Sequence, residues 1–151
     1  MEFDTRVAAY GVIVADGAVL LARWTGAGWP RWTLPGGGLE YGEDAATGAV
    51  REIREETGYS AKLQGLLGVD SKHIPAEKRL NGRRPLHAFR VIYSATVIDG
   101  ELKDEADGST DLARWIPLHR IPSLDRVDLV DLGLKLRFPD GVPVSHSAND
   151  R

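Results

Sequence analysis

The sequence contains no cysteine, and this absence removes several kinds of site at once. Without thiols the chain cannot form disulfides, thiolate metal sites or a cysteine nucleophile. No run of residues approaches the roughly 18 apolar positions that a membrane-spanning helix needs. The N-terminus also lacks a basic region followed by an apolar stretch, so we expect no signal peptide. These features favour a cytoplasmic protein with no membrane partner.

A strong excess of one charge is also missing. The formal net charge is −3, from 19 basic and 22 acidic residues. A protein that binds polymeric nucleic acid usually carries a basic excess, so we expect a small phosphorylated ligand instead. A few arginines and a bound cation are enough to hold such a ligand. The length of 151 residues, of which 42% are hydrophobic, fits one globular domain.

Hydrophobic periodicity and turn residues divide the chain into strands and two helices. Strands are expected at 6–14, 19–22, 63–69, 87–97 and 112–117, with a short extended piece at 32–34. Helices are expected over about 44–57, with Gly58 as the stop, and over 124–137. The segment 70–85 is predicted to be a basic, irregular loop. We therefore predict one domain over 1–138 and a flexible tail over 139–151.

The first predicted helix carries three glutamates on one side. At 100° per residue, Glu52, Glu55 and Glu56 share about 100° of arc and border the apolar stripe that contains Ile53. Neighbouring carboxylates repel one another and weaken a helix, and a bound divalent cation removes that conflict. Mg²⁺ prefers oxygen ligands and is usually shared with substrate phosphates. The pattern predicts such a site, and an exposed acidic helix is the alternative.

Three residues near these glutamates have predicted supporting roles. Arg51 stands four residues before Glu55, a favourable spacing for an ion pair. Glu43 precedes the helix, where a carboxylate meets the positive end of the helix dipole, so we expect it to cap the helix and to contact Arg51 at a distance. Gly48 lies one turn before Glu52. It either leaves open volume for a phosphate or hydrated metal, or it allows close packing.

The segment from Gly37 to Tyr59 resembles the Nudix box, G-x5-E-x7-R-E-U-x-E-E-x-G-U, in which U is a bulky apolar residue. Every position fixed by identity matches, and a chance match is on the order of 10⁻⁸ per starting position. Tyr59 is aromatic where the family usually has an aliphatic residue. The preceding Leu34-Pro35-Gly36-Gly37 also resembles the family's approach to the box.

The resemblance implies an α/β fold, an α/β/α sandwich with a mixed β-sheet between helices. It also implies hydrolysis of a pyrophosphate bond in a nucleoside diphosphate linked to another moiety. The substrate would be a nucleoside triphosphate, oxidised or not, or an ADP-ribose-like nucleotide sugar. Mg²⁺ is the implied cofactor, and Mn²⁺ is expected to substitute for it. Many related proteins are dimers, so a homodimer is an open alternative.

The resemblance also implies roles for individual residues. Glu52, Glu55 and Glu56 match the family's metal-binding and catalytic glutamates, with Arg51 beside them. Either Glu52 or Glu55 would accept the proton of the attacking water. A glycine carbonyl that binds metal matches Gly36 or Gly37. A later acidic residue joins the site in many members, and the candidates are Glu105, Asp107 and Asp111, of which we choose Asp111.

Residues outside the box must select the substrate. Trp29 and Trp32, like Trp24, can stack on a base, although packing inside the protein is the commoner role of a tryptophan. Arg23 at a strand end can contact phosphate or ribose. Pro75, sixteen residues after Tyr59, resembles a marker of ADP-ribose-cleaving members. The basic loop can attract polyphosphates or simply remain solvated.

Two other functions compete with a hydrolase. A catalytically silent nucleotide-binding sensor with the same fold is the first alternative, although such a protein need not keep three mutually repelling glutamates. An isomerase of isoprenoid diphosphates is the second. It would need a further acid/base pair, and the lack of cysteine removes one usual candidate.

Overall fold

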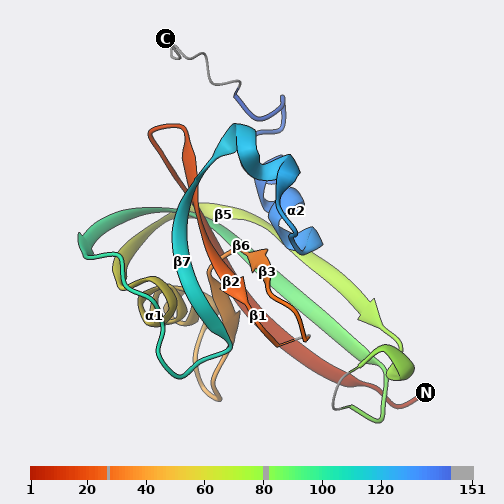
Figure 1. Ribbon diagram of the computed structural model, residues 1–151. Helices are drawn as coiled ribbons and strands as arrows, with labels where there is room; N and C mark the ends of the chain where they lie inside the picture. Colours follow the sequence, from red (N-terminus) through yellow and green to blue (C-terminus); the bar gives the residue numbers. More distant parts are fainter. Residues whose placement is uncertain (27, 80–81, 144–151) are drawn as a thin grey trace.

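The computed structural model describes residues 1–26, 28–79 and 82–143. In this part of the chain, four strands precede the first helix, and three further strands, two 3₁₀ segments and a second helix follow it (Figure 1). In chain order the elements are β1 Asp4–Ala15, β2 Ala18–Trp24, β3 Arg31–Thr33, β4 Gly36–Gly38, α1 Ala45–Thr57, β5 Tyr59–Ile74, the 3₁₀ segment η1 Ala76–Lys78, β6 Leu86–Gly100, β7 Thr110–Pro117, the 3₁₀ segment η2 Leu118–Ser123 and α2 Asp128–Arg137.

All the strands belong to one mixed sheet. Its order is β3-β2-β1-β6-β5, and β4 and β7 pair with β1 and β2 respectively. The pair β1–β6 is parallel, whereas the other pairs are antiparallel. β1 is the central strand. Residues 4–13 of β1 pair with β6, residues 8–10 also pair with β4, and residues 14–15 pair with β2.

The two α-helices cover opposite faces of this sheet. Val12 of β1 packs in a core with Leu129 and Val130 of α2. The next residue, Ile13, packs in a second core with Ile53 of α1. Successive side chains of a strand point to opposite faces, so consecutive residues of β1 serve two separate cores. This arrangement confirms the predicted α/β/α sandwich with a mixed sheet (Figure 1).

Most of the predicted elements are confirmed, but three boundaries differ. β5 continues to Ile74 because it stays paired with β6 along its whole length, so the start of the predicted loop is strand. The glycine run at 36–38 forms β4 by pairing with β1. α2 begins at Asp128 rather than 124. The backbone of Trp32 bonds Asp125 and Val127, which therefore lie alongside β3 instead of coiling.

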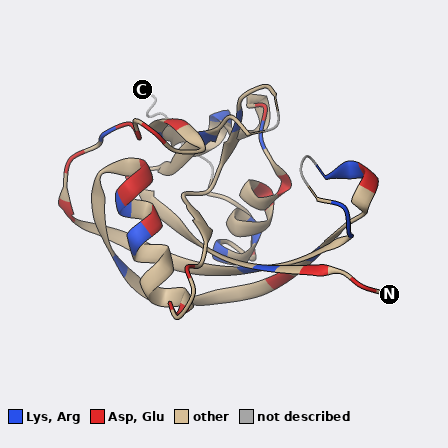
Figure 2. Ribbon diagram, turned by 90° about the horizontal axis from the view of Figure 1, so that it is seen from below, with Lys and Arg blue, Asp and Glu red and all other residues tan. Residues whose placement is uncertain are grey.

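The basic segment after β5 does not face the glutamate helix. Arg79 and Arg84 form ion pairs with Asp4, at 2.7 and 2.8 Å. Figures 1 and 2 both show η1 near the N-terminus and α1 at the other end of the sheet. Pro75 precedes η1 at this remote end. The described part of the basic loop therefore lies far from the glutamate helix, and its arginines Arg79 and Arg84 pair with Asp4.

The remaining described residues add two findings. None of the helices between residues 1 and 143, apart from the gaps named above, is long and apolar enough to cross a membrane. Residues 139–143 are exposed coil, and residues 144–151 of the predicted tail lie outside the described residues.

The homodimer stays a prediction. Phe3 and Val7 are among the exposed apolar side chains near the start of the sheet.

The ends of α1 follow from two residues. Asp44 caps the helix, because its carboxylate accepts a hydrogen bond from the Thr47 N–H at 2.7 Å. Gly58, with a φ of 82°, ends it and donates its N–H to the Arg54 carbonyl. The prediction that Glu43 is the cap is therefore wrong. Its carboxylate accepts from the Glu40 N–H and pairs with Arg51.

Replacing Asp44 with alanine should lower the free energy of unfolding by about 1 kcal/mol, because an N-terminal amide of α1 loses its acceptor. Equilibrium urea unfolding measures this loss. Asp140→Ala changes an exposed aspartate beyond α2 and is the matched control, for which we expect little change. Equal stability losses in the two variants would contradict the capping role.

Candidate active site

Helix α1 places the carboxylate of Glu56 next to the backbone of β4. The side chain of Glu56 is buried, with 4% of the residue exposed. One of its oxygens accepts a hydrogen bond from the Gly36 N–H at 3.1 Å. Because β4 is paired with β1, this amide belongs to a rigid part of the sheet. The position of Glu56 is thus fixed by both the helix and the sheet.

Gly36 and Gly37 of β4 allow close contacts that a side chain would prevent. A side-chain carbon on Gly37 would collide with the carboxylate of Glu52. Gly36 has a φ of 148°, which other residues rarely adopt, and a side-chain carbon there would collide with the backbone of Ala9 and Tyr10. Glycine is therefore required at position 36, while the absence of a side chain at Gly37 leaves the space that the Glu52 carboxylate occupies.

Burial and mutual repulsion perturb both of these glutamates. Burial raises the pKa of Glu52 to about 7, with a further increase from the charge of Glu55. Burial also raises the pKa of Glu56 well above its usual value, and the Gly36 N–H offsets only part of that effect. Both carboxyl groups thus hold a proton more readily than a free glutamate does, unless a positive charge is placed beside them.

Arg51 supplies positive charge on the outer side of the cluster. Its guanidinium forms ion pairs with Glu43 at 2.7 Å, Glu55 at 3.2 Å and Glu52 at 3.5 Å. It also donates to the Gly38 carbonyl at 3.3 Å. The predicted ion pair with Glu55 is confirmed, and the contact with Glu43 is direct. The hydrogen bonds from Arg51 lower the pKa of Glu43 to about 2.

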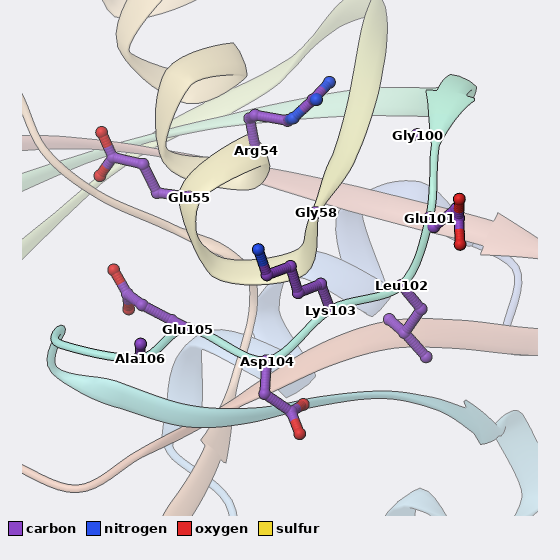
Figure 3. A pocket seen from close by; sticks show the side chains of 10 residues that line it. All are labelled: Arg54, Glu55, Gly58, Gly100, Glu101, Leu102, Lys103, Asp104, Glu105 and Ala106. Atoms are coloured by element: carbon purple, nitrogen blue, oxygen red, sulfur yellow. The ribbon is translucent and has the colours of Figure 1, made fainter.

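A fourth carboxylate comes from the loop before β7. Glu105 faces Glu55 across a pocket of about 660 Å³ between the end of α1 and residues 100–106 (Figure 3). Its charge contributes to the raised pKa values of Glu52 and Glu56. The Thr110 hydroxyl donates to Glu105 at 2.8 Å and holds it at the start of β7.

Asp111, the acidic residue chosen from the sequence, has a different partner in the structure. Both carboxylate oxygens of Asp111 accept hydrogen bonds from Arg23, at 3.0 and 2.6 Å. Asp107 is exposed on the loop. Of the three acidic candidates, Glu105 is the one whose charge acts on the helix glutamates, and Arg23 and Asp111 are occupied with each other.

The predicted substrate tryptophans have different surroundings. Trp32 packs against the core that contains α2, and its backbone holds residues 125–127. It therefore has a structural role in which the ring is not free to stack on a base. Trp29 is 60% exposed in the loop between β2 and β3 and is free to do so.

The open volume considered at Gly48 does not exist. A side-chain carbon there would collide with Leu39 and lie 3.0 Å from a carboxylate oxygen of Glu43. The glycine instead lets the 39–43 loop pack against α1, which brings Glu43 within reach of Arg51. The alternative of close packing is the correct one.

The arrangement fits a divalent cation, although the ligands are not fully gathered. In the part of the chain that the structure describes, no three acidic or histidine side chains already form a metal-binding group, as Glu55 turns towards Arg51. The donors are nevertheless all oxygens, and the Glu56 carboxyl group is buried. Hard cations such as Mg²⁺ prefer this chemistry.

Comparison with known proteins settles the family. The family model described as NUDIX domain matches residues 4–134. The chain belongs to the Nudix family. Among its Nudix relatives is the ADP-ribose pyrophosphatase of Methanocaldococcus jannaschii, which is 34% identical over 119 residues, 78% of this chain and 65% of that protein.

Solved Nudix structures share the fold. The NUDIX hydrolase from Nitrosomonas europaea has a TM-score of 0.77 at 23% identity, over 91% of this chain and 90% of that one. The MutT NUDIX hydrolase from Burkholderia pseudomallei has a TM-score of 0.70 at 28% identity, over 88% and 98%. The aligned part of this Nudix chain spans between 42% and 65% of the first curated relatives.

The metal-free protein should lose stability as the pH rises from about 5 to about 8. The pKa of Glu52 in the folded protein, about 7, lies above the value of about 4.3 for an unfolded chain. The folded state therefore binds more protons in this window, and stability is lost as the group ionises. Thermal unfolding in EDTA at a series of pH values measures the loss.

Two controls accompany this titration. Mg²⁺ should raise Tm most at the upper end of the pH range, because it stabilises the ionised carboxylates. Glu52→Gln should flatten the dependence on pH. A metal-free Tm that does not change over this range would show that Glu52 is not destabilised as described.

Proposed function

We propose that the protein hydrolyses the pyrophosphate bond of a nucleoside diphosphate linked to another moiety, with a divalent cation as cofactor. The observation that carries this proposal is a pair of carboxylates held against the glycine backbone of β4, of which Glu56 is buried and Glu52 is half-buried. Buried groups of like charge are costly, and a cation shared with phosphate oxygens would compensate them.

The cation site of this proposal is formed by carboxylates from two parts of the chain. Glu52, Glu55 and Glu56 would hold the cation, with a carbonyl oxygen from Gly36 or Gly37. Glu105 takes the place for which Asp111 was chosen, because its charge acts on Glu52 and Glu56. Mg²⁺ is the proposed cation, and Mn²⁺ should substitute. When bound, the cation supplies neutralisation of the phosphate oxygens and a more acidic water.

The protein's own side chains would accept the proton and position the other carboxylates. The carboxylate of Glu52 or Glu55 would accept a proton from the attacking water. The water oxygen attacks one phosphorus in line, and the bond from that phosphorus to the bridging oxygen breaks. Two phosphorylated products leave. Arg51 positions the outer carboxylates through Glu43 and Glu55.

Two substrate classes remain within this proposal. The name of the Methanocaldococcus jannaschii relative supports an ADP-ribose-like nucleotide sugar. The name of a Bacillus subtilis relative, a putative 8-oxo-dGTP diphosphatase that is 58% identical over 40 residues, supports a nucleoside triphosphate, oxidised or not. The proline marker adds no weight to the first class, because Pro75 lies at the remote end of β5.

With Mg²⁺ present, a panel of nucleoside diphosphate derivatives should yield phosphorylated products, and EDTA should abolish their release. In ¹⁸O-labelled water, one of the two products should carry the label. Glu52→Gln and Glu56→Gln should each lower kcat by about 100-fold or more, because a proton acceptor or a cation ligand is lost. Product analysis by mass spectrometry measures both effects.

A matched pair of variants tests the role given to Glu105. Glu105→Gln should lower kcat strongly, whereas Asp111→Asn should leave kcat within a few-fold, since Asp111 serves Arg23. A larger loss of kcat in Asp111→Asn than in Glu105→Gln would assign this role to Asp111 instead. Nucleotide binding without any Mg²⁺-dependent product would instead favour the catalytically silent sensor.

A further inference from the structure

A cluster of two tryptophans and one arginine lies at the junction of β2 and β3. Trp24, the last residue of β2, pairs with Arg31, the first residue of β3. The guanidinium carbon of Arg31 lies 5.6 Å from the centre of the Trp24 ring and 5.9 Å from that of Trp29. We call these three residues the Trp–Arg cluster. None of the roles described above uses Arg31.

The cluster lies at the same end of the sheet as Glu105. Trp24 also pairs with Thr110 of β7, whose hydroxyl donates to Glu105. The Thr25 N–H donates to the Ser109 carbonyl at 2.9 Å, which ties the β2–β3 loop to the loop that carries Glu105. Figure 1 shows the end of β2 beside the start of β7.

The cluster also faces the same side of the sheet as α1. Leu20 of β2 packs in the core with Ile53 of α1. Side chains two residues apart on a strand share a face, so Trp24, four residues after Leu20, points to the α1 side. Arg31 is its direct partner on β3 and lies on that side as well. The cluster is therefore on the catalytic side of the sheet.

Arg31 is held without a full set of partners. Its Nε is buried and has no hydrogen-bond acceptor. A positive group stacked on indoles, with a buried donor unpaired, is costly to maintain. Buried polar atoms without a partner are uncommon in folded proteins, so this one calls for an explanation.

We propose that the Trp–Arg cluster is the subsite for the nucleobase of the substrate, and that it prefers a base with two adjacent acceptors, as in guanine. Trp29, which is 60% exposed, stacks on the base, and the guanidinium of Arg31 donates to its edge. This inference rests on the proposed function and extends it by naming the kind of base.

The preference follows from the donors of arginine. A guanidinium has donors and no acceptor. Guanine presents two acceptors, O6 and N7, on one edge, whereas adenine presents an N7 acceptor beside an N6 donor. Arg31 therefore matches the guanine edge with two hydrogen bonds and the adenine edge with one. Stacking on Trp29 discriminates little, because every base has a π-face.

The test uses GMP and AMP with Mg²⁺ present, so that the protein carries its cation and no pyrophosphate bond is available for hydrolysis. Isothermal titration calorimetry should show GMP binding about tenfold more tightly than AMP. Arg31→Met should remove this preference by weakening GMP about tenfold and leaving AMP nearly unchanged. Trp29→Ala should weaken both nucleotides to a similar degree.

A matched control separates the subsite from packing. Arg137 also stacks on an aromatic ring, that of Phe138 at 4.7 Å, but at the end of α2. Arg137→Met should leave both affinities unchanged. A lower Tm in Arg31→Met without a change in the ratio of GMP to AMP affinity would mean that Arg31 only packs the β2–β3 junction, and would overturn the proposal.

Two further outcomes of the same titration would also overturn it. The first is a wild-type protein that binds GMP and AMP equally, or neither. The second is ribose 5-phosphate binding as tightly as GMP, which would show that the phosphate alone drives binding. Failure to hydrolyse any nucleotide would count against the proposed function but not against this subsite, since neither GMP nor AMP is hydrolysed here.

Discussion

The confinement of the Glu56 carboxylate between α1 and the backbone of β4 is the constraint on which the rest of the site depends. The helix brings the carboxylate to the sheet, and the Gly36 N–H fixes one of its oxygens. Because the group is almost fully buried, its ionised form needs compensation that a single amide does not provide. The roles of the neighbouring residues follow from the uncompensated charge of the ionised Glu56 carboxylate.

The positive charge that the chain itself supplies is distributed unevenly among the carboxylates. Arg51 lies on the outer side, where it neutralises Glu43 and Glu55. The inner carboxylates, Glu52 and Glu56, keep raised pKa values, and Glu105 adds negative charge. This unevenness leaves a strongly negative, oxygen-lined region against a glycine backbone. A divalent cation with a phosphate chain is the ligand that such a region fits best.

The sequence predicted the part of the site that one helix determines. The spacing of Glu52, Glu55 and Glu56 fixes their arc, because helix geometry is the same in every protein. The motif also predicted the sandwich and the sheet, and the four-residue spacing of Arg51 and Glu55 predicted their ion pair. These predictions succeeded because the residues involved are close in sequence or belong to a recognisable pattern.

The remainder depends on contacts between segments that are distant in sequence. Asp111 and Glu105 could not be ranked, since the partner of Asp111 is Arg23, 88 residues away. The start of α2 depends on backbone bonds to Trp32. The packing at Gly48 depends on how the 39–43 loop folds back. Loops carry little periodic signal, so neither side-chain partners nor close packing could be read from them.

The most direct test of the central claim is whether the inner carboxylates bind a cation. Electron paramagnetic resonance of Mn²⁺, titrated with wild type and with Glu56→Gln, measures free and bound metal without any substrate. Wild type should bind Mn²⁺, and Mg²⁺ should displace it, while Glu56→Gln should bind about tenfold or more weakly. Equal Mn²⁺ affinity in the two proteins would contradict the account, because the buried carboxylate would then hold no cation.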